Sequence, residues 1–187
     1  MSADTKTALL DHAEQIARSR GFDGFSYADL ATAVGIRKAS IHYHFPTKAL
    51  LAEALIDRYH ENIMGICQEI DQAHNSGADR LMALINLYRN ALNEGKTLCL
   101  CIAFTTSRES LSDGVINKIG EFRQMMIDWL KATFELGLED QSIVNVDKPI
   151  NEARSTLAIL EGAHLNARSQ ENVSLFDQSL ALLKDRL

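Results

Sequence analysis

Apolar side chains recur every three or four residues along most of this sequence, and that period matches one face of an α-helix. The longest run lies between residues 48 and 74, at Leu51, Leu55, Tyr59, Ile63, Ile66 and Ile70. The chain has 187 residues and 2 prolines, so few positions interrupt a helix. Its composition, 46% hydrophobic and 24% charged, is ordinary for a globular protein. The pattern therefore predicts an all-α fold, in one large domain or two small ones.

Capping and stop residues predict where the helices begin and end. A first helix over 2–20 ends at Gly21, which follows two arginines. A short second helix follows the N-cap Ser26 and ends near Val34, because Gly35 can adopt the left-handed conformation that closes a helix. A third short helix spans 38–44. The later patterns predict a larger helical bundle of about six helices, over 48–74, 81–92, 98–107, 119–136, 149–169 and 173–186.

The charges divide the chain into a locally basic N-terminal part and an acidic remainder. The formal net charge is −6, which by itself argues against a nucleic-acid-binding protein. Residues 1–48, however, carry six basic and five acidic groups, whereas the rest carries 13 basic and 20 acidic groups. Between residues 30 and 52 there is no acidic side chain at all. A DNA-binding surface is therefore expected in the N-terminal part.

Two short helices joined by Gly35-Ile36-Arg37, with a third helix before them, match the helix-turn-helix arrangement. Helical steps of 100° place Ile41 and Phe45 together on one side of the second short helix. The opposite side is small and polar, as suits a helix that enters the major groove, and cations stand at its two ends, where phosphates run. The predicted DNA-binding residues are Arg37, Lys38, Ala39, Ser40, His42, Tyr43, His44 and Lys48.

The segment FSYADLATAVGIRKASIHYHFPTKALL resembles the signature of the TetR family of bacterial transcriptional regulators. It matches at Leu30-Ala31, Gly35-Ile36, Ala39, Tyr43-His44-Phe45 and Lys48 with Leu51. The resemblance implies a helix-turn-helix DNA-binding domain over 1–47 and an effector-binding and dimerisation domain over 48–187. It further implies a cytoplasmic repressor that binds a palindromic operator as a homodimer and is released by a small-molecule effector.

Two residues depart from the family pattern. Arg37 stands where the family usually has a serine at the N-cap of the recognition helix. Losing a capping oxygen costs about 1 kcal/mol, and a cation there opposes the helix dipole, so we expect Arg37 to reach DNA instead. His42 replaces the usual first tyrosine of that helix, which leaves open the phosphate contact that a phenol would make.

The resemblance also places an effector pocket and a dimer interface after residue 48. An apolar pocket could be lined by large aromatic or polarisable sulfur-containing side chains, which here are Cys67, Tyr88, Cys99, Phe104, Met125 and Trp129. The segment LEGAHLNAR at 160–168 resembles the family's dimer helix, and its small residues would let two helices approach closely. The interface residues predicted there and in the last helix are Leu157, Leu160, Gly162, Ala163 and Leu180.

The three cysteines do not make a disulfide framework, which favours a reducing compartment. Side chains two apart on a helix diverge by about 200°, so Cys99 and Cys101 are not expected to form a disulfide. The segment resembles a branch of the family in which a cysteine senses electrophiles or oxidants. A thiol sensor and a pair of inert buried thiols both remain open. The longest charge-free stretch, 97–107, is far too short for a membrane span, and the N-terminus has no secretory pattern.

Two other classes of protein have less support in this sequence than a DNA-binding regulator. An enzyme lacks support because the sequence has no phosphate-binding glycine loop, nucleophile motif or paired metal spacing, so no catalytic residue, metal or cofactor is expected. His42 and His44 would point about 200° apart and cannot share a metal ion. Glu161 and His164 resemble half of a di-metal motif whose second half is missing. A helical adaptor that binds proteins alone would leave Tyr43 and Lys48 without DNA contacts.

Overall fold

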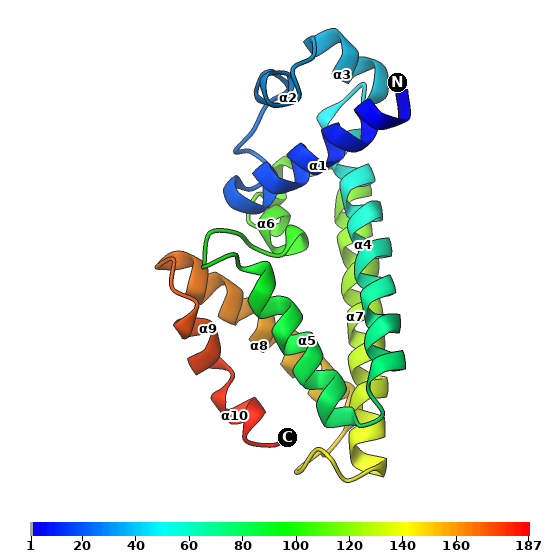
Figure 1. The fold of residues 1–187 in the computed structure, drawn as a ribbon, viewed down its shortest axis with the longest axis vertical. Coiled ribbons are helices and arrows are strands. Elements are labelled where there is room, and N and C mark those ends of the chain that lie inside the picture. Colours follow the sequence, from blue (N-terminus) through cyan, green and yellow to red (C-terminus); the bar gives the residue numbers. More distant parts are fainter. Residues whose placement is uncertain (1) are drawn as a thin grey trace. The chain divides into compact units, whose positions relative to one another are not determined.

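The computed structural model describes residues 2–187, with side chains from residue 5 onward, and these residues contain helices and no strand (Figure 1). The predicted all-α fold is confirmed. None of the described helices is long and apolar enough to cross a membrane. The elements in order are α1 (Ser2–Arg20), α2 (Tyr27–Val34), α3 (Lys38–His44), α4 (Lys48–Ala73), α5 (Gly77–Ala91), α6 (Leu100–Thr105), the 3-10 turn η1 (Arg108–Ser110), α7 (Asp113–Glu139), α8 (Pro149–Ser169), α9 (Ser174–Ser179) and α10 (Ala181–Lys184).

The chain forms two compact units that do not follow the expected division at residue 47. The first contains the residues up to Glu61 together with Leu100–Gly120, and the second contains Asn62–Cys99 and Glu121–Leu187. The difference arises because α4 and α7 are long helices that each supply residues to both units. In addition, α6 packs against α1, where the Phe22 and Phe104 rings meet edge to face at 5.5 Å.

The expected last helix over 173–186 is two short helices instead of one. Leu180 lies between them with φ −102° and ψ 4°, outside ideal helical geometry. The amides of Leu180 and Leu183 bond to carbonyls three residues back, so the hydrogen-bond ladder tightens there. Leu180 itself is fully buried, and the interruption lets both short helices keep apolar side chains in the core.

The first unit is built as the capping signals predicted. Ser26 caps α2: its hydroxyl accepts from the Asp29 amide, and the Asp29 carboxylate accepts from the Ser26 amide. Gly35 ends α2 with φ 73°, the left-handed conformation that glycine adopts without strain. Leu30 and Ile41 are completely buried and fix the two short helices against each other.

Lys48 closes this unit with a cation whose ammonium points inward. Its Nζ donates to the Phe22 and Phe25 carbonyls at 2.5 and 2.6 Å and lies 4.4 Å from the centre of each of those two rings. Burial lowers the pKa of the Lys48 ammonium, while Asp23 and Asp29 act in the opposite direction. The first turn of α4 is thereby tied to the loop between α1 and α2, which otherwise has no regular hydrogen-bond ladder.

The second unit is organised around a buried histidine and a close helix crossing. His164 is fully buried; its Nδ1 accepts from the Cys99 amide at 3.3 Å, and its Nε2 donates to the Tyr88 carbonyl at 2.8 Å. These partners fix the neutral Nε2–H tautomer, since an amide only donates and a carbonyl only accepts. Where α5 meets α7, a Cβ on Gly77 would lie 2.4 Å from Gly137 Cα, so the crossing requires glycine.

The role of Lys48 in the first unit yields a stability prediction. Lys48→Met keeps the aliphatic stem but leaves two partly buried carbonyls without their donor, which should lower the free energy of unfolding by about 1–3 kcal/mol. Urea unfolding followed by circular dichroism measures the difference. The control is Lys38→Met, the same exchange at an exposed site in the same unit, which should change stability by less than about 0.5 kcal/mol. Equal stability of the two variants would contradict the assigned role.

Candidate DNA-binding surface

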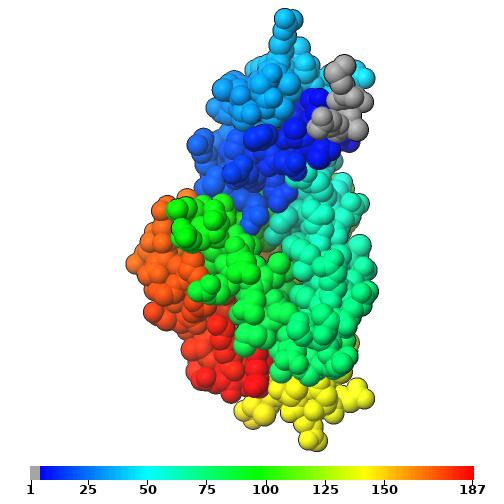
Figure 2. Space-filling model, in the orientation of Figure 1, coloured from blue at the N-terminus to red at the C-terminus, as the bar shows by residue number. Residues whose placement is uncertain are grey.

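One side of α3 is open to solvent and the other is packed against the first unit. Ile41 and Phe45 are inside, with 0% and 4% of their surface exposed, whereas Tyr43 is 81% exposed. This is the division that the helical spacing predicted. Figure 2 shows this part of the chain in light blue at the molecular surface. The outer side forms an open hollow lined by Thr5, Ile36, Arg37, Ala39, Ser40, Tyr43 and His44.

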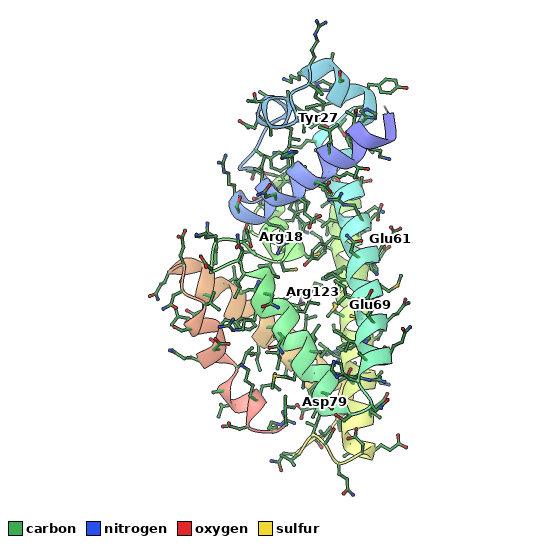
Figure 3. All side chains as sticks on the ribbon, in the orientation of Figure 1. Arg18, Tyr27, Glu61, Glu69, Asp79 and Arg123 are labelled. Atoms are coloured by element: carbon green, nitrogen blue, oxygen red, sulfur yellow. The ribbon has the colours of Figure 1, made fainter. Side chains whose placement is uncertain are left out.

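The position of α3 is fixed from α2 through Tyr27 (labelled in Figure 3). The buried Tyr27 hydroxyl donates to the Phe45 carbonyl at 2.8 Å, just past the end of α3. Burial raises the pKa of this phenol to about 12, so it stays a neutral donor at physiological pH. The Tyr27 ring also meets the His42 ring edge to face, with 4.9 Å between centres. The outward face of α3 is therefore presented by a rigid support.

The N-terminus of α3 carries cations in place of a cap. Arg37 is the N-cap residue, in an extended conformation and without a side-chain cap hydrogen bond, as its departure from the family pattern predicted. Arg37 and Lys38 are both exposed, and the first turn has no acidic residue. The free amides at a helix start attract anions, and two exposed cations strengthen that attraction. The arrangement suits a phosphate group.

The predicted DNA-binding residues do not all share this surface. Seven of them, Arg37 to Ser40 and His42 to His44, lie on α3 or at its start, and each is exposed or half-buried. The position of Lys48 requires a correction, because its ammonium is directed at the Phe22 and Phe25 carbonyls inside the unit. Lys48 therefore has a structural role here. The sequence showed a lysine at the start of a helix but not the two carbonyls that bind it.

Thr5, which lines this surface, and Tyr27, which supports it from inside, are not predicted by the sequence. Thr5 comes from α1, more than thirty positions before α3, and no local pattern connects it to the hollow that it lines. Tyr27 was treated as part of a helix start, although its hydroxyl and ring both support α3. An aromatic hydroxyl inside an otherwise apolar helical pattern was the available signal, since a buried phenol needs a hydrogen-bond partner.

The six predicted effector-pocket residues separate into two groups. Phe104 is fully buried in the first unit, where it packs on Phe22. The prediction that Phe104 lines one pocket with the other five residues is therefore corrected. Within the second unit, Cys67, Tyr88 and Cys99 are buried and Met125 and Trp129 are half-buried. The Trp129 indole donates to Asp71 at 3.2 Å.

The predicted dimer residues also need a correction. Leu157, Leu160, Ala163 and Leu180 have at most 2% of their surface exposed, because they fill the interior of their own subunit. Gly162 alone among the five is exposed, and a Cβ built on it would meet no atom within 4 Å. The apolar spacing correctly identified a packed face, but that face is turned toward α5 and α9 of the same chain.

The Glu161–His164 pair is occupied by other interactions. Both ring nitrogens of His164 are bonded to the backbone, and the Glu161 carboxylate is bound by Arg123 (labelled in Figure 3). The i, i+3 spacing thus serves two separate structural contacts.

Comparisons with known proteins agree with this geometry. The family model described as "Bacterial regulatory proteins, tetR family" matches residues 9–55, which cover α2, α3 and most of α1. The transcriptional repressor NemR of Escherichia coli is 24% identical over 97% of this chain and 93% of its own length. The biofilm operon regulator IcaR of Staphylococcus aureus is 21% identical over 97% of this chain and 94% of its own.

Solved structures extend the likeness over the whole chain. A TetR-family regulator from Agrobacterium tumefaciens superposes with a TM-score of 0.94 at 25% identity, covering 100% of this chain and 99% of that one. The reduced form of E. coli NemR superposes with a TM-score of 0.83 at 23% identity, covering 97% and 96%. These relatives are transcriptional regulators and not enzymes. With an exposed α3 that carries no acidic residue, this chain belongs to the TetR family of bacterial regulatory proteins and is a DNA-binding transcriptional regulator.

Proposed function

We propose that this protein is a cytoplasmic repressor that binds a palindromic operator as a homodimer through α3 and is released by a small-molecule effector. The observation that carries the proposal is the outward face of α3. It combines Tyr43, Ala39 and Ser40 with the cations Arg37 and Lys38, in a stretch of chain that has no carboxylate from residue 30 to 52. Phosphate contacts position such a helix, and small polar side chains read base edges.

Removal of one of these cations tests the proposal. Lys38→Ala should weaken binding to all duplex sequences and reduce the slope of log affinity against log salt by about one per subunit, since one phosphate contact is lost. Fluorescence anisotropy with labelled duplex DNA over a series of KCl concentrations measures that slope. Lys131→Ala, the same charge change on α7, should leave it unaltered. Salt-independent binding would refute the proposal, and absence of binding would favour the protein-binding adaptor.

A second surface supports the homodimer. The face of α8 opposite its packed side exposes Ala158, Ile159, Gly162, Leu165 and Asn166, which we call the α8 outer face. Ile159 and Leu165 are two large apolar side chains of this face, and they are 40% and 44% exposed. Asn166 donates to Ser179 at 3.4 Å, so the surface continues onto α9 (orange to red in Figure 2). Small residues between large apolar ones allow a second α8 to approach closely, and a two-fold operator requires a two-fold protein.

The α8 outer face gives the dimer prediction. Leu165→Glu should convert the dimer to monomers because it places two like charges in an apolar contact, whereas the subunit's own stability should change by less than about 0.5 kcal/mol at an exposed site. Sedimentation velocity and thermal unfolding report the two quantities separately. Met64→Glu, at a similarly exposed residue on α4, is the matched control and should remain dimeric. An unchanged dimer in Leu165→Glu would show that the interface lies elsewhere.

The effector is proposed to bind in the second unit. Five of the six predicted pocket residues lie there, and they offer aromatic, thioether and thiol groups, which suits an apolar small molecule. Since α4 supplies residues to both units, a shift of this helix is the physical route that we propose from the effector to α3. Release requires that the effector bind more tightly to the conformation that cannot hold DNA.

Thiol sensing is the second part of the proposed response. The three cysteines are each at most 3% exposed. Burial raises the pKa of the Cys67 thiol to about 12, and the negative charge of Asp71 adds a smaller effect in the same direction. This thiol therefore stays protonated and unreactive. The Cys99 amide is the donor to His164, so an adduct at Cys99 would press on that hydrogen bond. Cys101 is buried on α6, which packs against α1, so added bulk there also displaces packed side chains.

Alkylation with N-ethylmaleimide tests the sensor. DNA binding should fall slowly, at the rate of local opening, and either Cys99→Ser or Cys101→Ser should abolish the loss, while Cys67→Ser should behave as the wild type. Anisotropy and intact-mass measurements on the same samples relate binding to modification. If the thiols are modified in full while DNA affinity is unchanged, thiol sensing is ruled out and a non-covalent effector remains.

A further inference from the structure

The orientation of His42 has a consequence for DNA binding that its position alone does not reveal. Its ring is held by two contacts: Nδ1 lies 3.2 Å from the Pro46 carbonyl, and the ring packs edge to face on Tyr27. Tyr27 is itself fixed by its hydrogen bond to the Phe45 carbonyl. The imidazole of His42 is therefore oriented by its own subunit before any DNA arrives.

The Pro46 carbonyl also determines which nitrogen carries the proton. A carbonyl oxygen only accepts hydrogen bonds, so Nδ1 must be the protonated nitrogen whenever this contact is made. In the neutral ring the second nitrogen, Nε2, then carries a lone pair and no hydrogen. His42 is exposed and lies one helical turn after Lys38, on the stripe of α3 that flanks the base-reading face. Nε2 is thus the nitrogen left for a DNA partner.

A phosphate cannot use that lone pair, because its oxygens are acceptors as well. We infer that His42 contacts a DNA phosphate as the imidazolium, with Nδ1–H on the Pro46 carbonyl and Nε2–H on the phosphate, so that each subunit takes up one proton at His42 on binding DNA. The inference rests on the proposed function, since it assumes that α3 is the DNA-binding helix. It makes operator affinity depend on pH in the range in which histidines change charge, about pH 5 to 8.

The charged surroundings are compatible with this step. Asp29 is the one carboxylate of α2 and α3, and the hydroxyl and amide of Ser26 lower its pKa, so it is ionised and already bonded within its own helix start. A phosphate seated beside the cations of α3 offsets their charge and supplies the acceptor that the second N–H needs. Within α2 and α3 the titratable and charged groups besides His42 are Tyr27 and Asp29 of α2 and Arg37, Lys38, Tyr43 and His44 of α3. The adjoining helices bring the ammonium of Lys6, 5.8 Å from the centre of the Phe45 ring, and the ammonium of Lys48, which is bound to the Phe22 and Phe25 carbonyls.

The neighbouring His44 provides an internal comparison. Its ring nitrogens bond to none of the described side chains or carbonyls, although its ring packs edge to face on Tyr43. Neutral His44 is therefore free to place its single hydrogen on either nitrogen and can donate to a phosphate without a proton from solution. The two histidines of one short helix should thus respond differently to pH.

The test measures DNA affinity against pH with the full-length protein and a labelled duplex pool of randomised sequence, at fixed ionic strength. The wild type should lose affinity as pH rises from about 6 to 8, by up to about tenfold per pH unit for each proton taken up. His42→Gln and His42→Tyr, whose amide and phenol donate at every pH in this range, should bind with little pH dependence. His44→Gln, the same exchange two residues along, should keep the wild-type slope.

Two readouts separate failure of this inference from failure of the proposed function. Two results would overturn the role of His42 and leave DNA binding through α3 intact. One is an equal dependence of DNA affinity on pH in the wild type and in His42→Gln. The other is wild-type binding that depends on salt but not on pH. Nitrogen-15 NMR of the imidazole in the free protein near pH 8 needs no DNA: the Nδ1–H tautomer is expected at His42, and the Nε2–H tautomer would overturn the inference. Loss of DNA binding at every pH would instead refute the proposed function.

Discussion

The DNA-binding unit depends on one inward-pointing cation. Lys48 brings its ammonium to the carbonyls of Phe22 and Phe25 and to the faces of both rings, so one side chain joins the start of α4 to the loop between α1 and α2. Removing a charge from water is unfavourable unless it gains good partners, and these carbonyls and ring faces are those partners. Arg58 reinforces the same junction through Asp11 and Glu14 of α1. The support of α3 is thus electrostatic as well as apolar.

His164 and His42 illustrate how the surroundings decide what the same side chain does. His164 lies in the core between a backbone amide and a backbone carbonyl, which fix the Nε2–H tautomer and use both nitrogens. His42 lies at the surface with one carbonyl partner, which fixes the opposite tautomer and leaves the other nitrogen exposed. The first arrangement is complete and structural. The second is incomplete, and it becomes complete only with a proton and an anion.

Apolar residues on α8 show a similar division of roles. Leu157, Leu160 and Ala163 recur at helical spacing because they pack inside the subunit, while Ile159 and Leu165 lie on the other side with Gly162 between them. A helix that is apolar on two sides has two surfaces to cover. Its own chain covers one, and we propose that a second subunit covers the other. The strongest periodicity of α8 thus indicates the core, and the weaker one indicates the surface that we propose for the partner.

The local features of this protein follow from its sequence. The all-α fold, the capping box at Ser26, the left-handed turn at Gly35 and the inner and outer sides of α3 all follow from spacing and residue type over a few positions. Those properties depend on backbone geometry within one or two helical turns. The family resemblance over 25–51 can also be identified from the sequence, because a helix-turn-helix needs its glycine and its apolar residues at fixed positions.

The tertiary structure alone decided which partners those residues meet. Lys48 turned inward because two carbonyls from a loop more than twenty positions earlier converge on it, and Phe104 joined the first unit because α6 packs on α1. The assignment of α8 residues to the core or to the outer face required the neighbouring helices, since spacing defines a face without saying what covers it. Contacts between residues far apart in sequence are set by packing, and no local pattern encodes them.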